Sequence, residues 1–206
     1  MYERESVPLY ARLRSREAPP IPMPTLLTPR LELVPITLAM VEAVMLGQRE
    51  QAESVAGARL PAMWPNRALV ERAFSVSLDL IRADPAARLW GDRLIVSRGG
   101  AGEERRVLGS VVFNGRPEAA GIVEVAYGVE EGSQGLGYGT EATRACVEWA
   151  LVQDGVAAVQ ATTAAWHAAS LRIIEKLGMV PAGTRDHELF GELLVFQLSR
   201  SRPHAL

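Results

Sequence analysis

The sequence predicts one mixed α/β (α+β) domain, with a mostly antiparallel sheet flanked by helices. Two observations carry this prediction. Over residues 89–129, short β-branched segments follow one another between glycine-rich turns, and helical periodicity flanks them on both sides. A chain of 206 residues suits one domain of ordinary size, which we place at residues 30–206. Residues 1–29 are rich in proline and arginine without apolar periodicity, so we expect an extended or disordered N-terminal extension there.

The first predicted elements of the domain are a strand and two helices. Residues 31–34 begin the strand, and Thr37 is placed to cap the helix that follows. Residues 66–83 predict a second helix with one buried stripe. The stripe comprises Leu69, Ala73, Val76 and Leu80. Between the helices, proline-rich residues 60–65 predict a rigid apolar loop.

The remaining elements alternate between the strand period of two residues and the helical period of about 3.6 residues. We expect an antiparallel meander, a long helix running to Val152, a strand, a helix that ends at Gly178, and two final strands. The expected strands are 89–97, 107–113, 122–129, 156–162, 180–188 and 193–198, and the last helix is 168–177. Cys146 falls on the buried face of the long helix.

Composition argues against several classes of protein. The chain has 24 acidic and 22 basic residues, so it lacks the basic excess expected of a nucleic-acid-binding domain. Its single cysteine and three scattered histidines form neither a disulfide framework nor a zinc site, and we expect no metal. Because no apolar run approaches the ~20 residues of a membrane span and no signal peptide is visible, we expect a cytoplasmic protein without membrane contact.

The sharpest local signal is the glycine-rich turn at residues 134–140, between a predicted strand and a predicted helix. Such a turn exposes backbone N–H groups at the positive end of a helix, where a phosphate or pyrophosphate binds well. A nucleotide P-loop would end in Gly-Lys-Ser/Thr, but Thr140 follows Gly139 here without a lysine. A dinucleotide fingerprint would follow the first strand of parallel β-α units. A tight turn without any ligand is the structural alternative.

Three segments together resemble the GCN5-related N-acetyltransferases, and within them the branch of the ribosomal-protein N-terminal acetyltransferases. The segments are Glu124–Val129, Gln134–Ala142 and Ser170–Met179. The resemblance covers about residues 28–199. It implies a GNAT fold with splayed central strands, acetyl-CoA as cofactor, direct acetyl transfer to a primary amine such as a protein N-terminus or a small amine, and a homodimer.

The resemblance also implies how the coenzyme is held. Gln134 matches the first position of the family's pyrophosphate-binding turn, and the next residues supply main-chain amides. These residues are Gly135, Leu136, Gly137, Tyr138, Gly139 and Thr140. Tyr127 and Val129 would bind the pantetheine arm through their main chains, like an added strand. Gly128 lies where a bulge would help the strands part.

Three residues are candidates for the proton transfers. Glu124 matches the family's acidic strand position and is the candidate base, or a strand carboxylate that is only solvated or salt-bridged. Ser170 matches a serine that could serve the thiolate or bind pantetheine, or satisfy first-turn backbone donors. His167 replaces the usual asparagine and could inherit its hydrogen bonds, act as base or acid, or only cap a helix. Ile174 replaces the tyrosine proposed to protonate CoA in many members.

The acceptor side is less defined. Met63, Trp64, Trp90 and Phe113 could wall an apolar acceptor pocket or pack in the core. At pH 7 deprotonation of an α-ammonium group costs only about 1–1.4 kcal/mol, against roughly 4.6 kcal/mol for a lysine ammonium group. An N-terminal acceptor can therefore be deprotonated by a weaker or more remote base. The buried position of Cys146 disfavours an acyl-cysteine intermediate. A CoA-binding sensor without turnover is the competing function, and a purely structural partner protein is the third.

Overall fold

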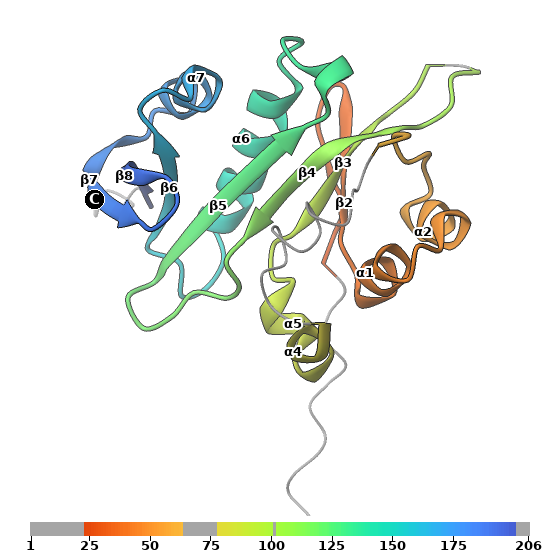
Figure 1. The fold of residues 1–206 in the computed structure, drawn as a ribbon, viewed down its shortest axis with the longest axis horizontal. Coiled ribbons are helices and arrows are strands. Elements are labelled where there is room, and N and C mark those ends of the chain that lie inside the picture. Colours follow the sequence, from red (N-terminus) through yellow and green to blue (C-terminus); the bar gives the residue numbers. More distant parts are fainter. Residues whose placement is uncertain (1–22, 64–77, 101, 201–206) are drawn as a thin grey trace, which may run out of the picture.

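The computed structural model describes residues 23–63, 78–100 and 102–200. Within them, one eight-stranded sheet has the order β1-β2-β3-β4-β5-β6-β8-β7 (Figure 1). The strands are β1 Leu26–Leu27, β2 Leu31–Pro35, β3 Arg93–Ser97, β4 Val107–Phe113, β5 Ile122–Val129, β6 Ala158–Ala164, β7 Val180–His187 and β8 Gly191–Ser199. All neighbours pair antiparallel except β5 and β6, which pair parallel. The predicted mixed sheet is therefore confirmed.

Helices cover both faces of the sheet (Figure 1). They are α1 Leu38–Met45, α2 Arg49–Ala56, α4 Leu78–Ala83, α5 Pro85–Arg88, α6 Tyr138–Leu151 and α7 Ala168–Leu177. Alternate side chains of β3 enter two separate cores, because successive strand residues point to opposite faces. Ile95 packs in the core that contains Cys146 of α6 and Ile174 of α7. Leu94 packs in the core that contains Val41 of α1.

Local signals explain where several helices begin and end. The Thr37 hydroxyl accepts a hydrogen bond from the Met40 N–H at 3.3 Å and caps α1, as predicted. Gly178 ends α7 with φ of 74°, a left-handed conformation that suits glycine. The expected helix at residues 66–83 falls mostly outside the described residues. In its last turns Ile81 is buried, whereas Leu80 is 50% exposed, so the predicted stripe is wrong at Leu80.

Four elements of the described residues were not predicted: β1, α2, α5 and a 3-10 helix at Glu131–Ser133. β1 pairs with β2 within the expected extension, so the fold begins before residue 30. The polar helix α2 has little apolar periodicity to reveal it. Helix α5 ends at Arg88 and a turn follows it, so the strand expected at 89–97 begins only at Arg93. Its start was readable in the sequence, because Asp84 caps the Ala87 N–H at 3.0 Å and Pro85 occupies the first turn.

The central strands β5 and β6 part as predicted. Their parallel pairing runs only from Ile122 with Ala158 to Glu124 with Gln160. β5 then continues to Val129 and β6 to Ala164, and Figure 1 shows them diverging. The strands therefore form a fork whose apex is at Glu124, with an unpaired edge of β5 along one side.

A glycine in β4 permits the close approach of β5. A β-carbon at Gly109 would lie 2.0 Å from the Gly128 carbonyl oxygen, a backbone atom that cannot move without displacing β5. We expect Gly109→Ala to lower the free energy of unfolding by about 3 kcal/mol, measured by chemical denaturation. Gly183→Ala is the control, because Gly183 also has a positive φ but nothing within 4 Å. Equal losses in both variants would contradict this packing argument.

A buried acid should make stability depend on pH. Burial raises the pKa of Asp92 to about 8, although its Oδ1 accepts a hydrogen bond from the Phe113 N–H at 2.7 Å. The folded protein therefore binds more protons than the unfolded chain between about pH 4 and 8. Its stability should fall as pH rises through that window, by at most about 1.4 kcal/mol per pH unit from this group. Denaturation at pH 5 and pH 8 should show a smaller fall in Asp92→Asn, and identical pH profiles would contradict the assignment.

Candidate active site

The glycine-rich loop presents unpartnered backbone donors. Among the described residues, no acceptor is found for the backbone N–H groups of residues 135–140. Gly137 is the N-cap of α6 with φ of 84°, and Gly135 has φ of 77°. These left-handed conformations turn successive amides outward at the positive end of a 14-residue helix. The loop thus fits an anion such as a pyrophosphate without any lysine.

Residues before β2 hold this loop in place, and no sequence pattern indicated them. The Glu141 carboxylate in the first turn of α6 accepts hydrogen bonds from the Thr28 hydroxyl at 2.6 Å and the Arg30 Nε at 2.7 Å. Burial alone would raise the pKa of Glu141, but the hydrogen bonds from Thr28 and Arg30 outweigh it and lower that pKa. Arg30 also donates to the Leu136 carbonyl at 2.9 Å and lies 4.6 Å from the centre of the Tyr138 ring.

Arg30 should therefore support coenzyme affinity. In Arg30→Gln the negative Glu141 would stand unneutralised beside the phosphate-binding amides, so we expect the Kd for acetyl-CoA to rise roughly two- to fivefold, about 0.5–1 kcal/mol. The double variant Arg30→Gln/Glu141→Gln should recover part of the affinity. Isothermal titration calorimetry measures both, and a double variant no better than the single one would refute this charge argument.

The unpaired edge of β5 is oriented for main-chain binding. Hydrogen bonds from the Asn114 N–H to the Glu124 carbonyl and from the Glu130 N–H to the Leu108 carbonyl place even-numbered residues of β5 in pairs with β4. Tyr127 and Val129 therefore direct their N–H and C=O groups into the fork. The Gln134 side chain donates to the Val129 carbonyl at 2.9 Å, which ties the loop to the end of this edge.

The predicted bulge at Gly128 is wrong. The β4–β5 register continues unbroken from Phe113 opposite Val125 to Gly109 opposite Val129. The strands part instead because β6 ends its pairing with β5 after Glu124.

Tyr127 and Ser170 meet beneath the fork. The Tyr127 hydroxyl lies 2.9 Å from the Ser170 Oγ, and burial raises the pKa of Tyr127. Ser170 is buried and its hydroxyl is engaged by this tyrosine rather than by first-turn backbone donors. His167 is the N-cap residue of α7 but makes no side-chain capping bond. Its Nδ1 lies 3.5 Å from the Thr163 hydroxyl.

Glu124 lies at the apex of the fork and is ion-paired. Its Oε1 accepts a hydrogen bond from the Arg185 Nη2 at 2.7 Å, and its Oε2 lies 3.5 Å from the Asn114 amide nitrogen. The same Arg185 nitrogen donates to the Thr162 hydroxyl at 2.8 Å. The sequence did not reveal Arg185, because β7 brings it to Glu124 from 61 positions away in the chain.

Of the four residues expected to wall an acceptor pocket, the three that the structure describes do not form one. Trp90 and Phe113 pack edge to face at 5.4 Å, and Trp149 of α6 lies 5.1 Å from Trp90. This packing on the α6 side favours a core role for both. Met63 is 83% exposed, and Trp64 lies outside the described residues.

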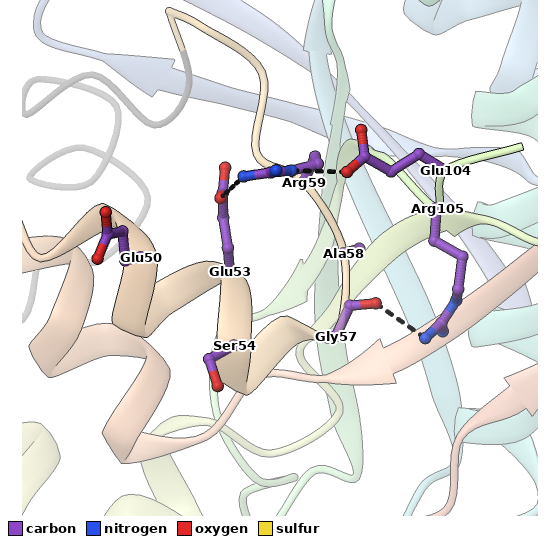
Figure 2. Close-up of a pocket in the computed structure, with 8 residues that line it drawn as sticks. All are labelled: Glu50, Glu53, Ser54, Gly57, Ala58, Arg59, Glu104 and Arg105. Atoms are coloured by element: carbon purple, nitrogen blue, oxygen red, sulfur yellow. Dashed lines mark hydrogen bonds and ion pairs between the residues drawn. The ribbon is translucent and has the colours of Figure 1, made fainter.

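A separate polar pocket lies beside α2 (Figure 2). It is lined by Glu50, Glu53, Ser54, Gly57, Ala58, Arg59, Glu104 and Arg105. Most of its charges are already paired with one another. Arg59 bridges Glu53 at 2.9 Å and Glu104 at 2.7 Å, and Arg105 donates to the Gly57 carbonyl at 2.9 Å. We assign it no role in the reaction, since none of the predicted site residues lines it.

Two further observations bear on the chemistry. Burial raises the pKa of the Cys146 thiol to about 12, so a thiolate nucleophile is disfavoured there. In the described part of the chain, no cluster of three metal-ligating side chains is found, and no helix is long and apolar enough to cross a membrane.

Comparisons with known proteins agree with this geometry. Residues 30–180 match the acetyltransferase (GNAT) domain family. The chain is 25% identical over 153 residues to an uncharacterized N-acetyltransferase of Bacillus subtilis (strain 168), YjdG, covering 74% of this chain and 88% of that protein. Its fold resembles a ribosomal-protein-S5-alanine acetyltransferase from Vibrio fischeri, with a TM-score of 0.59 and 13% identity over 88% of this chain and 100% of that one.

A second similar structure contains the coenzyme. It is a ribosomal L7/L12 α-N-protein acetyltransferase in complex with coenzyme A, with a TM-score of 0.56 and 12% identity over 85% of this chain and 97% of that one. The unpartnered amides of the loop and the open edge of β5 fit acetyl-CoA as the cofactor of this chain. The chain belongs to the GNAT acetyltransferase family.

Proposed function

We propose that this protein transfers an acetyl group from acetyl-CoA directly to a primary amine, either a protein or peptide N-terminus or a small amine. The observation that carries the proposal is the alignment of three features. Unpartnered amides of residues 135–140 lie at the mouth of the fork, the open edge of β5 runs inward from them, and Glu124 stands at the apex. From Val129 to Glu124 the edge is about 17 Å long, so a coenzyme anchored at the loop reaches the apex by an extended arm.

In this proposal the loop amides, with Gln134 and Arg30 behind them, hold the diphosphate, and Tyr127 and Val129 bind pantetheine. Bound acetyl-CoA supplies the thioester. Glu124 takes a proton from the acceptor ammonium through its exposed face, since its side chain is 21% exposed.

Two residues near the fork serve the leaving group. The Ser170 Oγ gives a proton to the leaving thiolate and takes up the proton that the amine nitrogen loses on acylation, and the Tyr127 hydroxyl at 2.9 Å orients it. This pair supports an acid despite the absence of the usual tyrosine, whose position is taken by the buried Ile174. His167, without a capping bond, is available to bind pantetheine or exchange protons. Cys146 takes no part.

The competing function is a CoA sensor without turnover, favoured by the ion pair that engages Glu124. Release of free thiol from acetyl-CoA, measured with peptides, amino acids, polyamines and aminoglycosides, separates the two. We expect thiol release with at least one amine. Tight CoA binding without release from any of them would favour the sensor, and failure to bind CoA would leave only a structural role.

Two further properties stay predictions: the homodimer implied by the resemblance, and the cytoplasmic localisation expected from the sequence. A homodimer would appear in analytical ultracentrifugation as a sedimenting species of twice the 22.3 kDa chain. Cytoplasmic localisation would appear on cell fractionation.

A further inference from the structure

We infer that the acceptor amine carries its own carboxylate, and that Glu124 and Arg185 together bind the two charges of a free α-amino acid. The inference rests on the proposed function, because it names the acceptor class for that same site. It goes beyond it by excluding peptide N-termini, in which the nearby carboxylate has become an amide.

The first step is the pairing of opposite charges at the apex of the fork. The Glu124 Oε1 and the Arg185 Nη2 lie 2.7 Å apart, on the face of the sheet opposite α6. An α-amino acid carries its ammonium and carboxylate on one carbon. A carboxylate and a guanidinium side by side therefore match it charge for charge.

The second step is the unused capacity of Arg185. Both of its hydrogen bonds, to Glu124 and to the Thr162 hydroxyl, come from Nη2. Among the described residues, Nε and Nη1 have no partner. The Arg185 side chain is 49% exposed, so its unpartnered Nη1 can donate a charge-assisted hydrogen bond to a ligand carboxylate without breaking the bond from Nη2 to Glu124.

The third step is the fixed position of the guanidinium. Arg185 extends from β7 across β8 to reach Thr162 on β6 and Glu124 on β5, and so spans both arms of the fork. An arginine that only solubilised an edge strand would need no such anchors. Held there, it places the ligand carboxylate beside the atom that receives the ammonium proton, and so positions the amine at the apex.

The test compares each common α-amino acid with its own α-amide, which retains the amine but mimics a peptide N-terminus. Thiol release from acetyl-CoA gives kcat/KM for both. We expect at least one amino acid to exceed its amide, and Arg185→Gln to reduce that ratio at least about tenfold, or about 1.4 kcal/mol. Dividing the wild-type ratio by the variant ratio cancels the different intrinsic reactivities of the two amines.

Arg82→Gln is the matched control. Arg82 of α4 pairs with Glu42 at 2.8 Å and is 46% exposed, close to the values for Arg185, but it lies on the helices away from the fork. We expect this control to leave the ratio unchanged. Arg185→Lys keeps the charge but lacks the separate nitrogens with which arginine can bond Glu124, Thr162 and a ligand together, and should fall between wild type and Arg185→Gln.

A binding measurement does not depend on turnover. Protein saturated with CoA, which has no acetyl group to transfer, is titrated calorimetrically with the preferred amino acid and with its amide. The inference is supported if the amino acid gives a heat of binding and its amide gives none, and if this heat is lost in Arg185→Gln. If amides, peptides or polyamines release thiol as well as every amino acid does, this inference fails while the proposed function stands. If no amine releases thiol, the proposed function fails as well.

Discussion

Glu124→Gln should lower kcat for acetyl transfer by about 10²- to 10⁴-fold while leaving the affinity for acetyl-CoA unchanged. Glutamine has the same shape and still offers an oxygen to the Arg185 guanidinium at the apex of the fork, but it cannot take a proton from the acceptor. The loop amides that bind the coenzyme lie at the other end of β5 and are untouched. Thiol-release kinetics give kcat, and calorimetry with acetyl-CoA gives Kd.

The control for this variant is Glu42→Gln. Glu42 also pairs with an arginine, Arg82, at 2.8 Å, and is remote from the fork. We expect its kcat to equal that of the wild type. Unchanged turnover in Glu124→Gln would remove Glu124 from the reaction, and a parallel loss of coenzyme affinity would indicate a structural role instead.

Gly137→Ala should weaken acetyl-CoA binding by at least about tenfold. An alanine at φ of 84° costs about 1–2 kcal/mol in that conformation, and its β-carbon would lie 3.3 Å from the Arg30 Nη2. The loop can relieve this strain only by rotating the amides that face the diphosphate. Calorimetry with acetyl-CoA measures the loss.

Gly47→Ala separates loop geometry from general strain. Gly47 has a similar φ of 69° with nothing within 4 Å, and lies after α1, far from the loop. We expect it to lose about 1 kcal/mol of stability while keeping full coenzyme affinity. If both alanine variants bound acetyl-CoA as the wild type does, the loop amides would not be the anchor.

Much of the fold was predictable because it rests on local signals. The strand Val107–Phe113 and the helix Ala168–Leu177 have the predicted bounds, since turns and a terminal glycine delimit them. The glycine-rich loop was predictable for the same reason. Helix α2 was not, because most of its residues are polar and only Ala52 and Ala56 are buried.

The missed parts of the site depend on contacts between distant segments. Arg30 and Glu141 are 111 positions apart in the chain, and Arg185 and Glu124 are 61 positions apart. No local sequence pattern indicates either pair. Packing also determines that Trp90 and Phe113 lie in the core rather than in an acceptor pocket. Both are large apolar residues near the right strands, but the sequence could not show that Trp149 lies against Trp90 from α6.

The central claim is that backbone amides of residues 135–140 hold the diphosphate of acetyl-CoA. Calorimetry tests it most directly, with acetyl-CoA and with S-acetyl-pantetheine, which has the thioester arm but no phosphate. We predict measurable heat and saturation for acetyl-CoA below millimolar concentration, and a loss of at least about a hundredfold in affinity for S-acetyl-pantetheine, because two or more charge-assisted hydrogen bonds are missing. Absence of heat with millimolar acetyl-CoA, or equal affinity for the two compounds, would contradict it.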